Sequence, residues 1–146
     1  MDRGTAVLLT ALAGGVISLQ APVNALLGDR IGTPAALFVS FLVGTVALLG
    51  LVVAAGDVGR VGGAGAAPWW MLTGGVMGAV FVTSLVVTIR SLGVGGITAA
   101  AIAGQLVVAV VVDHFGWLGV ERQPASFARV AGIALLAAGT FLVVRE

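Results

Sequence analysis

The sequence has few charged residues and contains no cysteine, no lysine and no tyrosine. Only 9% of its 146 residues are charged and 60% are hydrophobic, whereas charged residues make up about 25% of an average soluble domain. So few charges cannot cover a soluble surface, and the composition therefore excludes a soluble globular protein. The absence of cysteine excludes disulfides and thiolate metal sites.

The seven basic residues are all arginines that stand singly along the chain, which is not the clustered pattern of a nucleic-acid-binding surface. The glycine-rich stretch 56–67 lacks the lysine and the following helix pattern of a phosphate-binding loop. His114 is the only histidine, and no catalytic arrangement accompanies it. We therefore expect no enzyme activity, no cofactor, no metal and no nucleic-acid partner.

Long apolar runs dominate the chain, and the hydrocarbon core of a bilayer needs about 20 apolar residues as a helix. The runs predict a single all-α membrane domain over 1–146 whose five helices lie at about 5–27, 34–55, 68–89, 94–112 and 127–144. We predict Thr33 and Ser126 as N-caps of the second and fifth helices. The first run is too long and too polar for a cleaved signal peptide, so we expect it to be retained.

The arginines divide almost equally between the two sides of the membrane. With five helices the N-terminal side carries four of them, namely Arg3, Arg60, Arg122 and Arg129, and the other side carries Arg30, Arg90 and Arg145. Because the excess of arginine sets orientation, this balance favours dual topology, in which the chain inserts both ways and pairs with itself as an antiparallel homodimer. An oppositely inserted homologue, giving a heterodimer, and a single fixed orientation are the alternatives.

Neutral polar residues interrupt the first apolar run. Gln20 and Asn24 are four residues apart and therefore share a helix face. Pro22 between them has no N–H, so the carbonyl of Ser18 loses its helical partner and the helix is expected to break. Unpaired polar groups cannot face lipid. These residues are therefore predicted to line a substrate pathway, with hydrogen bonding between helices as the alternative.

A second polar face is predicted on the fourth helix, where Thr98, Ala101 and Gln105 are spaced by three and four residues. Gln105 lies near the midplane and keeps its depth when a subunit is inverted. Two copies could therefore line one central cavity, although a helix contact explains the face as well. Ser40 on the second helix is a weaker pathway candidate.

Helix ends and glycines provide the remaining candidates. Asp113 and His114 close the fourth helix and form a candidate gate, although a plain interfacial helix end with Gly116 in the following turn is the simpler explanation. Gly132 and Gly139 are seven residues apart and lie nearly on one helix face. We predict that they form the packing surface of the dimer.

The order of these motifs resembles the YdcZ-like family of the drug/metabolite transporter superfamily. The motifs are QAPVN (20–24), LG (27–28), SFLVGT (40–45), PWW (68–70), GGVMG (74–78), GQ (104–105) and DHFG (113–116). The resemblance covers the chain from the first helix to the fifth. It implies a bacterial inner-membrane protein that forms half of a ten-helix transporter, completed by an inverted partner. It implies no particular substrate.

We therefore expect a small multi-pass transporter that moves a small neutral or zwitterionic solute by alternating access at an inverted-dimer interface. Phe41, Trp69 and Phe81 are expected to complete the walls of the cavity. The expected partners are a second copy or a close homologue, the solute and membrane lipid. A dual-topology ion channel and a non-transporting membrane assembly factor are the alternatives.

Overall fold

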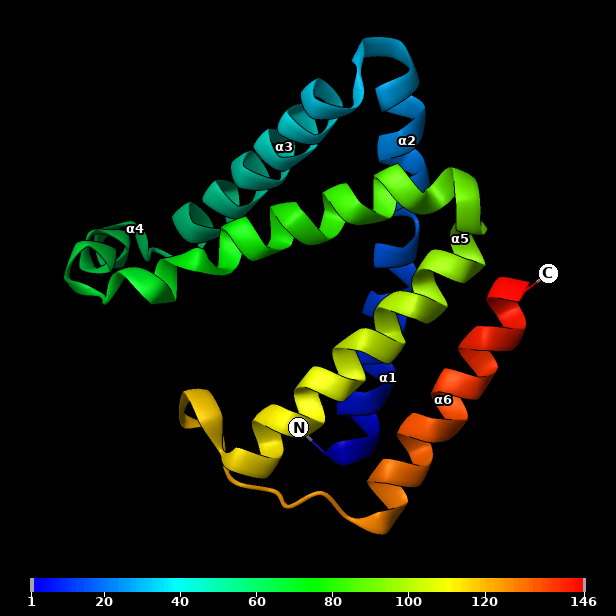
Figure 1. Cartoon of the computed structure of the whole chain (residues 1–146). Helices are drawn as coiled ribbons and strands as arrows, with labels where there is room; N and C mark the ends of the chain where they lie inside the picture. The colour runs from blue at the N-terminus through cyan, green and yellow to red at the C-terminus, as the bar shows by residue number, and fades with distance from the viewer. Residues whose placement is uncertain (1, 146) are drawn as a thin grey trace. The chain divides into compact units, whose positions relative to one another are not determined.

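A computed structural model describes residues 2–145; residues 1 and 146, the ends of the predicted domain, lie outside the described residues. The described residues contain helices and no strand, which confirms the predicted all-α fold class. In chain order the elements are α1 (Arg3–Ser18), α2 (Gln20–Ile31), α3 (Thr33–Ala54), α4 (Val58–Val61), η1 (Gly62–Ala66), η2 (Trp69–Thr73), α5 (Gly74–Phe115), η3 (Trp117–Gly119) and α6 (Phe127–Arg145) (Figure 1). Two compact units, Met1–Val87 and Thr88–Glu146, divide the chain.

Four helical stretches among the described residues are long and apolar enough to cross a membrane. They are Arg3–Ile31, Thr33–Ala54, Trp69–Phe115 and Phe127–Arg145. The third stretch covers both of the runs in which we predict separate helices, 68–89 (except Pro68) and 94–112. Gly93 lies between these runs with φ 65° and ψ 173°, a non-helical backbone, so α5 consists of two helical stretches that meet at this glycine.

The first helix, α1, is capped by the side chain of Asp2. Its two carboxylate oxygens accept hydrogen bonds from the Thr5 backbone N–H at 2.9 Å and from the Thr5 hydroxyl at 2.6 Å. The hydroxyl bond, followed by the backbone bond, lowers the pKa of the exposed Asp2 carboxyl. The cap is therefore present while Asp2 is ionised and is lost as the pH falls through this lowered pKa.

The turn between α2 and α3 corrects one of the predicted caps. The helix begins at Thr33 itself, and its N-cap is Gly32, so the prediction of Thr33 as the N-cap is wrong. Gly32 has φ 85°, a conformation that glycine adopts without steric cost, and its carbonyl accepts the Ala36 N–H at 3.0 Å. A Cβ atom at Gly28 would lie 3.5 Å from the Thr33 Cα, so α2 and α3 meet closely at this turn.

Three helices of the first unit share a small apolar core. Leu37 of α3 is buried together with Val82 and Val86 of α5, and Ala25 of α2 and Phe81 of α5 pack against them. In the second unit, α5 and α6 approach closely. A Cβ atom at Gly96 would lie 3.6 Å from Val144 Cγ2, and the Thr140 hydroxyl donates to the Ala99 carbonyl at 3.2 Å.

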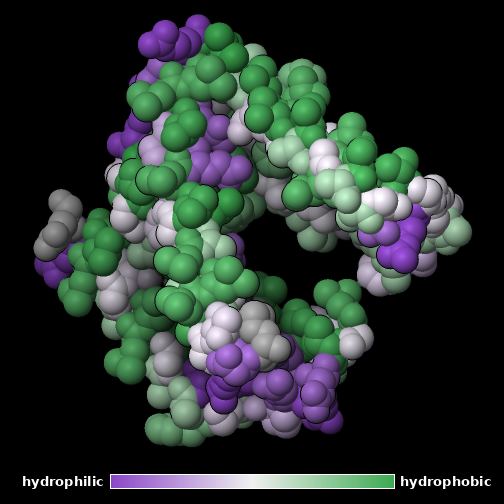
Figure 2. All heavy atoms as spheres, turned by 180° about the vertical axis from the view of Figure 1, so that it is seen from behind, coloured by the Kyte–Doolittle hydropathy of each residue, from purple (hydrophilic) through white to green (hydrophobic). Residues whose placement is uncertain are grey.

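The outer faces of the helices are apolar and uncovered. In the most apolar window of each candidate span, between 0% and 11% of the residues are buried inside the chain. Figure 2 shows hydrophobic residues over most of the visible face, with hydrophilic residues gathered in a few patches. Such surfaces must be covered by lipid or by other protein.

Candidate functional site

The first candidate span is interrupted close to its predicted break. α1 ends at Ser18, Leu19 forms a turn three residues before Pro22, and α2 begins at Gln20. The Leu19 N–H donates to the Val16 carbonyl at 3.1 Å, the spacing of a tighter turn. A single kinked helix over 5–27 is predicted, whereas the structure has two helices that extend to Ile31.

The polar side chains at this interruption differ in their surroundings. The Ser18 hydroxyl donates to the Gly14 carbonyl of its own helix at 2.9 Å. Gln20 is half-buried. Asn24 is only 2% exposed, and its amide nitrogen Nδ2 has no hydrogen-bond partner. Asn24 is therefore unusual among the predicted pathway residues, because buried amides normally have hydrogen-bond partners and its Nδ2 has none.

Several small residues surround Asn24 on its face of α2, which also carries Gln20. Ala21 is buried, Ala25 packs against the core, and a Cβ atom at Gly28 would lie 3.4 Å from the Thr33 hydroxyl oxygen. Positions 21, 24, 25 and 28 follow the spacing of one helix face. The half-buried Ser40 lies four residues after the fully buried Ala36 and therefore on the same face of α3.

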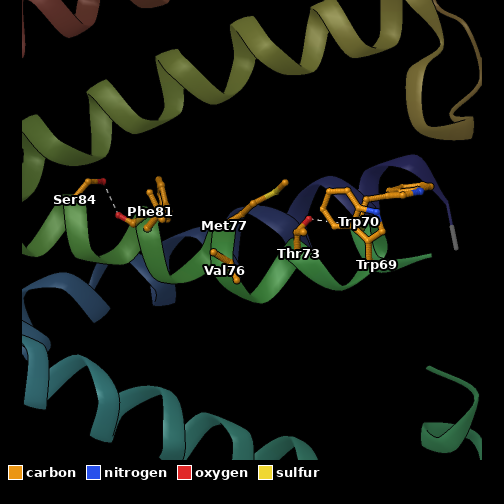
Figure 3. Close-up of a pocket in the computed structure, with 8 residues that line it drawn as sticks. Trp69, Trp70, Thr73, Val76, Met77, Phe81 and Ser84 are labelled. Atoms are coloured by element: carbon orange, nitrogen blue, oxygen red, sulfur yellow. Dashed lines mark hydrogen bonds between the residues drawn. The ribbon is translucent and has the colours of Figure 1, made fainter. Parts of the chain in front are cut away.

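A groove runs along η2 and the first half of α5. It has a volume of about 760 Å³ and is lined by Trp69, Trp70, Thr73, Val76, Met77, Val80, Phe81 and Ser84 (Figure 3). The Thr73 hydroxyl donates to the Trp70 carbonyl and the Ser84 hydroxyl to the Phe81 carbonyl, both at 2.7 Å. The groove is therefore mainly apolar and aromatic. Phe41 is not among its lining residues.

The predicted polar face of α5 belongs to the second unit. The Thr98 hydroxyl donates to the Val94 carbonyl of its own helix at 2.8 Å, and Ala101 is half-buried. Gln105 is exposed. Because Asn24 belongs to the first unit, the pathway that would join it to Gln105 remains a proposal.

The end of α5 is fastened to the segment that leads into α6. Gly116 ends the helix in the left-handed region, with φ 65°. The Ala125 N–H donates to Nδ1 of His114 at 3.0 Å, and the Arg122 side chain donates to the His114 carbonyl at 3.0 Å. The imidazole is therefore an acceptor at Nδ1, and the segment 116–126 is folded back onto the helix end.

An ion pair strengthens the same connection. Arg129 of α6 contacts the Asp113 carboxylate at 3.3 Å and also donates to the side chain and the carbonyl of Gln123. The predicted N-cap Ser126 is confirmed, because its hydroxyl accepts the Arg129 backbone N–H at 3.3 Å. Sequence reasoning missed the contact between Asp113 and Arg129, although the two residues lie at adjoining helix ends. The role of Asp113 and His114 as a gate stays a prediction.

Two glycines of α6 lie on its open side. Gly132 and Gly139 are exposed, and a Cβ atom at either would meet nothing within 4 Å. Their helix face is therefore free to approach another surface. Within residues 2–145, no group of three or more His, Cys, Asp or Glu side chains could hold a metal ion.

Comparison with known proteins identifies the family. The model of the family described as "Putative inner membrane exporter, YdcZ" matches residues 5–142. Inner membrane protein YdcZ of Escherichia coli (strain K12) is 32% identical over 78 residues, which are 53% of this chain and 52% of that protein. The match thus spans about half the length of this relative. No solved structure matches the chain. With its apolar helices, this multi-pass protein of the inner membrane belongs to the YdcZ family.

Proposed function

We propose that the chain exports a small uncharged or zwitterionic organic solute by alternating access, as one half of an antiparallel pair. The observation that carries the proposal is the interrupted first span, where α1 gives way to α2 beside the neutral amides of Gln20 and Asn24. Broken helices at polar positions recur in the binding sites of transporters. The description of the family as "Putative inner membrane exporter" supports transport in the outward direction.

The length of the third candidate span supports five crossings of the membrane. Trp69–Phe115 contains 47 residues and would extend about 70 Å as one continuous helix, whereas the hydrocarbon core is about 30 Å thick. The non-helical backbone at Gly93 divides α5 into 74–92 and 94–115, and each part is long enough for one crossing. Five crossings place the two termini on opposite sides.

The uncovered helix faces support a second copy. One chain buries at most 11% of the residues in the most apolar window of any candidate span, which is too little to enclose a path for a polar solute. An inverted copy would add a second wall, and the near-equal division of the arginines permits both orientations. In this arrangement, Gln105 and Thr98 of α5, together with Ser40 of α3, complete the polar path.

Solute flux in proteoliposomes tests the proposal. A thermal-shift screen of the purified protein against metabolites first selects the solutes. Gln20→Leu and Gln105→Leu should then reduce saturable flux at least tenfold, because an apolar side chain cannot replace the amide hydrogen bonds. Thr45→Val is the matched control, since Thr45 is not one of the proposed path residues and its hydroxyl donates to the Phe41 carbonyl within its own helix. Undiminished flux in both folded leucine variants would refute the path, and flux without saturation would indicate a channel.

A further inference from the structure

The amide of Asn24 combines almost complete burial with an unused hydrogen-bond donor. The residue is 2% exposed, and Nδ2 has no partner. Within the part of the chain that the structure describes, no other buried side-chain nitrogen or oxygen lacks one. A buried donor without an acceptor destabilises the protein that contains it. Its presence therefore points to a hydrogen-bond partner that binds at another stage of the transport cycle.

The face of α2 that carries Asn24 supplies no acceptor bonded to Nδ2. Gln20 shares this face of α2 but does not accept a hydrogen bond from Nδ2, and the other residues of that face, Ala21, Ala25 and Gly28, have no side-chain oxygen. Residues 4–28 contain no charged side chain, so no charged group of this segment competes with Nδ2 for an acceptor. The site thus presents one unpaired neutral donor on a helix face that also carries the Gln20 amide and small apolar residues.

We propose that Nδ2 of Asn24 donates a hydrogen bond to a carbonyl or carboxylate oxygen of the transported solute. This inference rests on the proposed function and adds the chemical class that the pathway selects, namely solutes with an exposed acceptor oxygen. An amide nitrogen only donates, so Nδ2 offers nothing to an organic ammonium group. The break at Leu19 lies just over one helical turn from Asn24, and movement at this break admits the solute to the occluded donor.

The sequence provides a direct spectroscopic test, because Asn24 is its only asparagine. Protein labelled with ¹⁵N-asparagine in detergent micelles therefore gives one side-chain NH₂ pair. Acetamide and acetate are titrated as carbonyl and carboxylate probes, and methylammonium is the cationic control of similar size. We expect a saturable downfield shift of the Nδ2 protons with one or both acceptor probes and none with methylammonium. A larger response to acetamide identifies a neutral carbonyl as the group selected, and a larger response to acetate identifies a carboxylate.

Absence of a shift with both acceptor probes, or a saturable shift with methylammonium, would overturn the assignment. The result is separable from the proposed function. A response to acetamide in protein that shows no flux would refute transport and leave the donor site standing. Flux without any response to either acceptor would refute the donor site alone.

Thermal unfolding without a solute distinguishes a solute-binding donor from a structural one. Asn24→Leu replaces the unpaired amide by an apolar side chain of similar size and should raise the unfolding temperature by about 2–4 °C. The same substitution should abolish saturable solute flux. Gln20→Leu is the matched control, since half-buried Gln20 has no buried, unpaired atom, and should leave the unfolding temperature unchanged. A lower unfolding temperature for Asn24→Leu would show that Asn24 holds helices together.

Discussion

The left-handed backbone conformation at Gly116 favours a residue without a side chain. Alanine at this position would hold the φ of 65° at a cost, and its Cβ atom would lie 3.3 Å from the Arg122 Cβ. We expect Gly116→Ala to lower the free energy of unfolding by about 1–2 kcal/mol. Thermal or denaturant unfolding in detergent measures the change.

Gly50→Ala is the control for that prediction. Gly50 is helical within α3, and a Cβ atom there meets nothing within 4 Å, so alanine should leave stability unchanged or raise it by up to about 1 kcal/mol. Equal effects of the two substitutions would contradict a special role for the turn at Gly116.

The pair of Asp113 and Arg129 gives a second prediction at this scale. Arg129→Gln removes the ion pair and the hydrogen bonds to Gln123, and should lower the free energy of unfolding by about 1 kcal/mol. The estimate is modest because both side chains are about one-third exposed, at 35% and 37%. Unfolding at low and high salt should show the difference shrinking as salt screens the pair.

Arg60→Gln is the matched control. Arg60 pairs with Asp57 at 2.9 Å, but its side chain is 84% exposed and the partners are three residues apart. Its loss should have no measurable effect. A comparable loss in both variants would mean that the connection to α6 adds nothing beyond an ordinary surface pair.

At the scale of single residues, the sequence predicts which side chains share a face but not which of them are buried or paired. The spacing of Gln20 and Asn24 predicts a shared polar face, but it cannot predict that only Asn24 is buried without a partner, because burial depends on α3 and α5 packing against α2. The hydrogen bond between Ala125 and His114 was equally inaccessible, since it depends on how the segment 116–126 folds back.

At the scale of elements, proline and glycine predict interruptions better than they locate them. Pro22 lacks an N–H and so predicts a break in the first span, yet the turn falls at Leu19, because the missing hydrogen bond belongs to the preceding turn of the helix. Thr33 has the side chain of an N-cap, but the positive φ of the chain reversal requires Gly32 there instead.

The α6 helix gives a prediction that distinguishes antiparallel from parallel pairing. Gly132 and Gly139 are placed almost symmetrically about the middle of Phe127–Arg145. In an antiparallel α6 pair, residue 132 of one copy therefore lies beside residue 139 of the other. Copies of the same residue lie about 10 Å apart along the axis, beyond the reach of a disulfide.

Cross-linking checks this arrangement, and the chain has no cysteine to interfere. A mixture of Gly132→Cys and Gly139→Cys chains should form a disulfide-linked dimer under mild oxidation, while each variant alone should form little. Efficient cross-linking of each variant with itself would indicate a parallel pair. Absence of all three cross-links would exclude this face of α6 as the dimer surface.

At the scale of the whole molecule, the balance of arginines predicts that both orientations occur. Single cysteines in place of Gly4 and of Glu146, which leave all seven arginines unchanged, should each be labelled by a membrane-impermeant maleimide in part of the population when intact cells are treated. Full labelling after permeabilisation is the control. Labelling of each terminus from one side only would exclude the antiparallel homodimer and leave the two alternatives, a homologue of opposite orientation as the partner or a single fixed orientation without one.

The scarcity of residues buried inside one chain has a consequence for regulation. If the working unit is a pair whose members bury their apolar faces against each other, its abundance follows mass action within the plane of the membrane. At low density, the number of pairs then grows with the square of the number of chains. A twofold change in gene expression would change export about fourfold, so the cell could adjust this activity steeply through copy number alone.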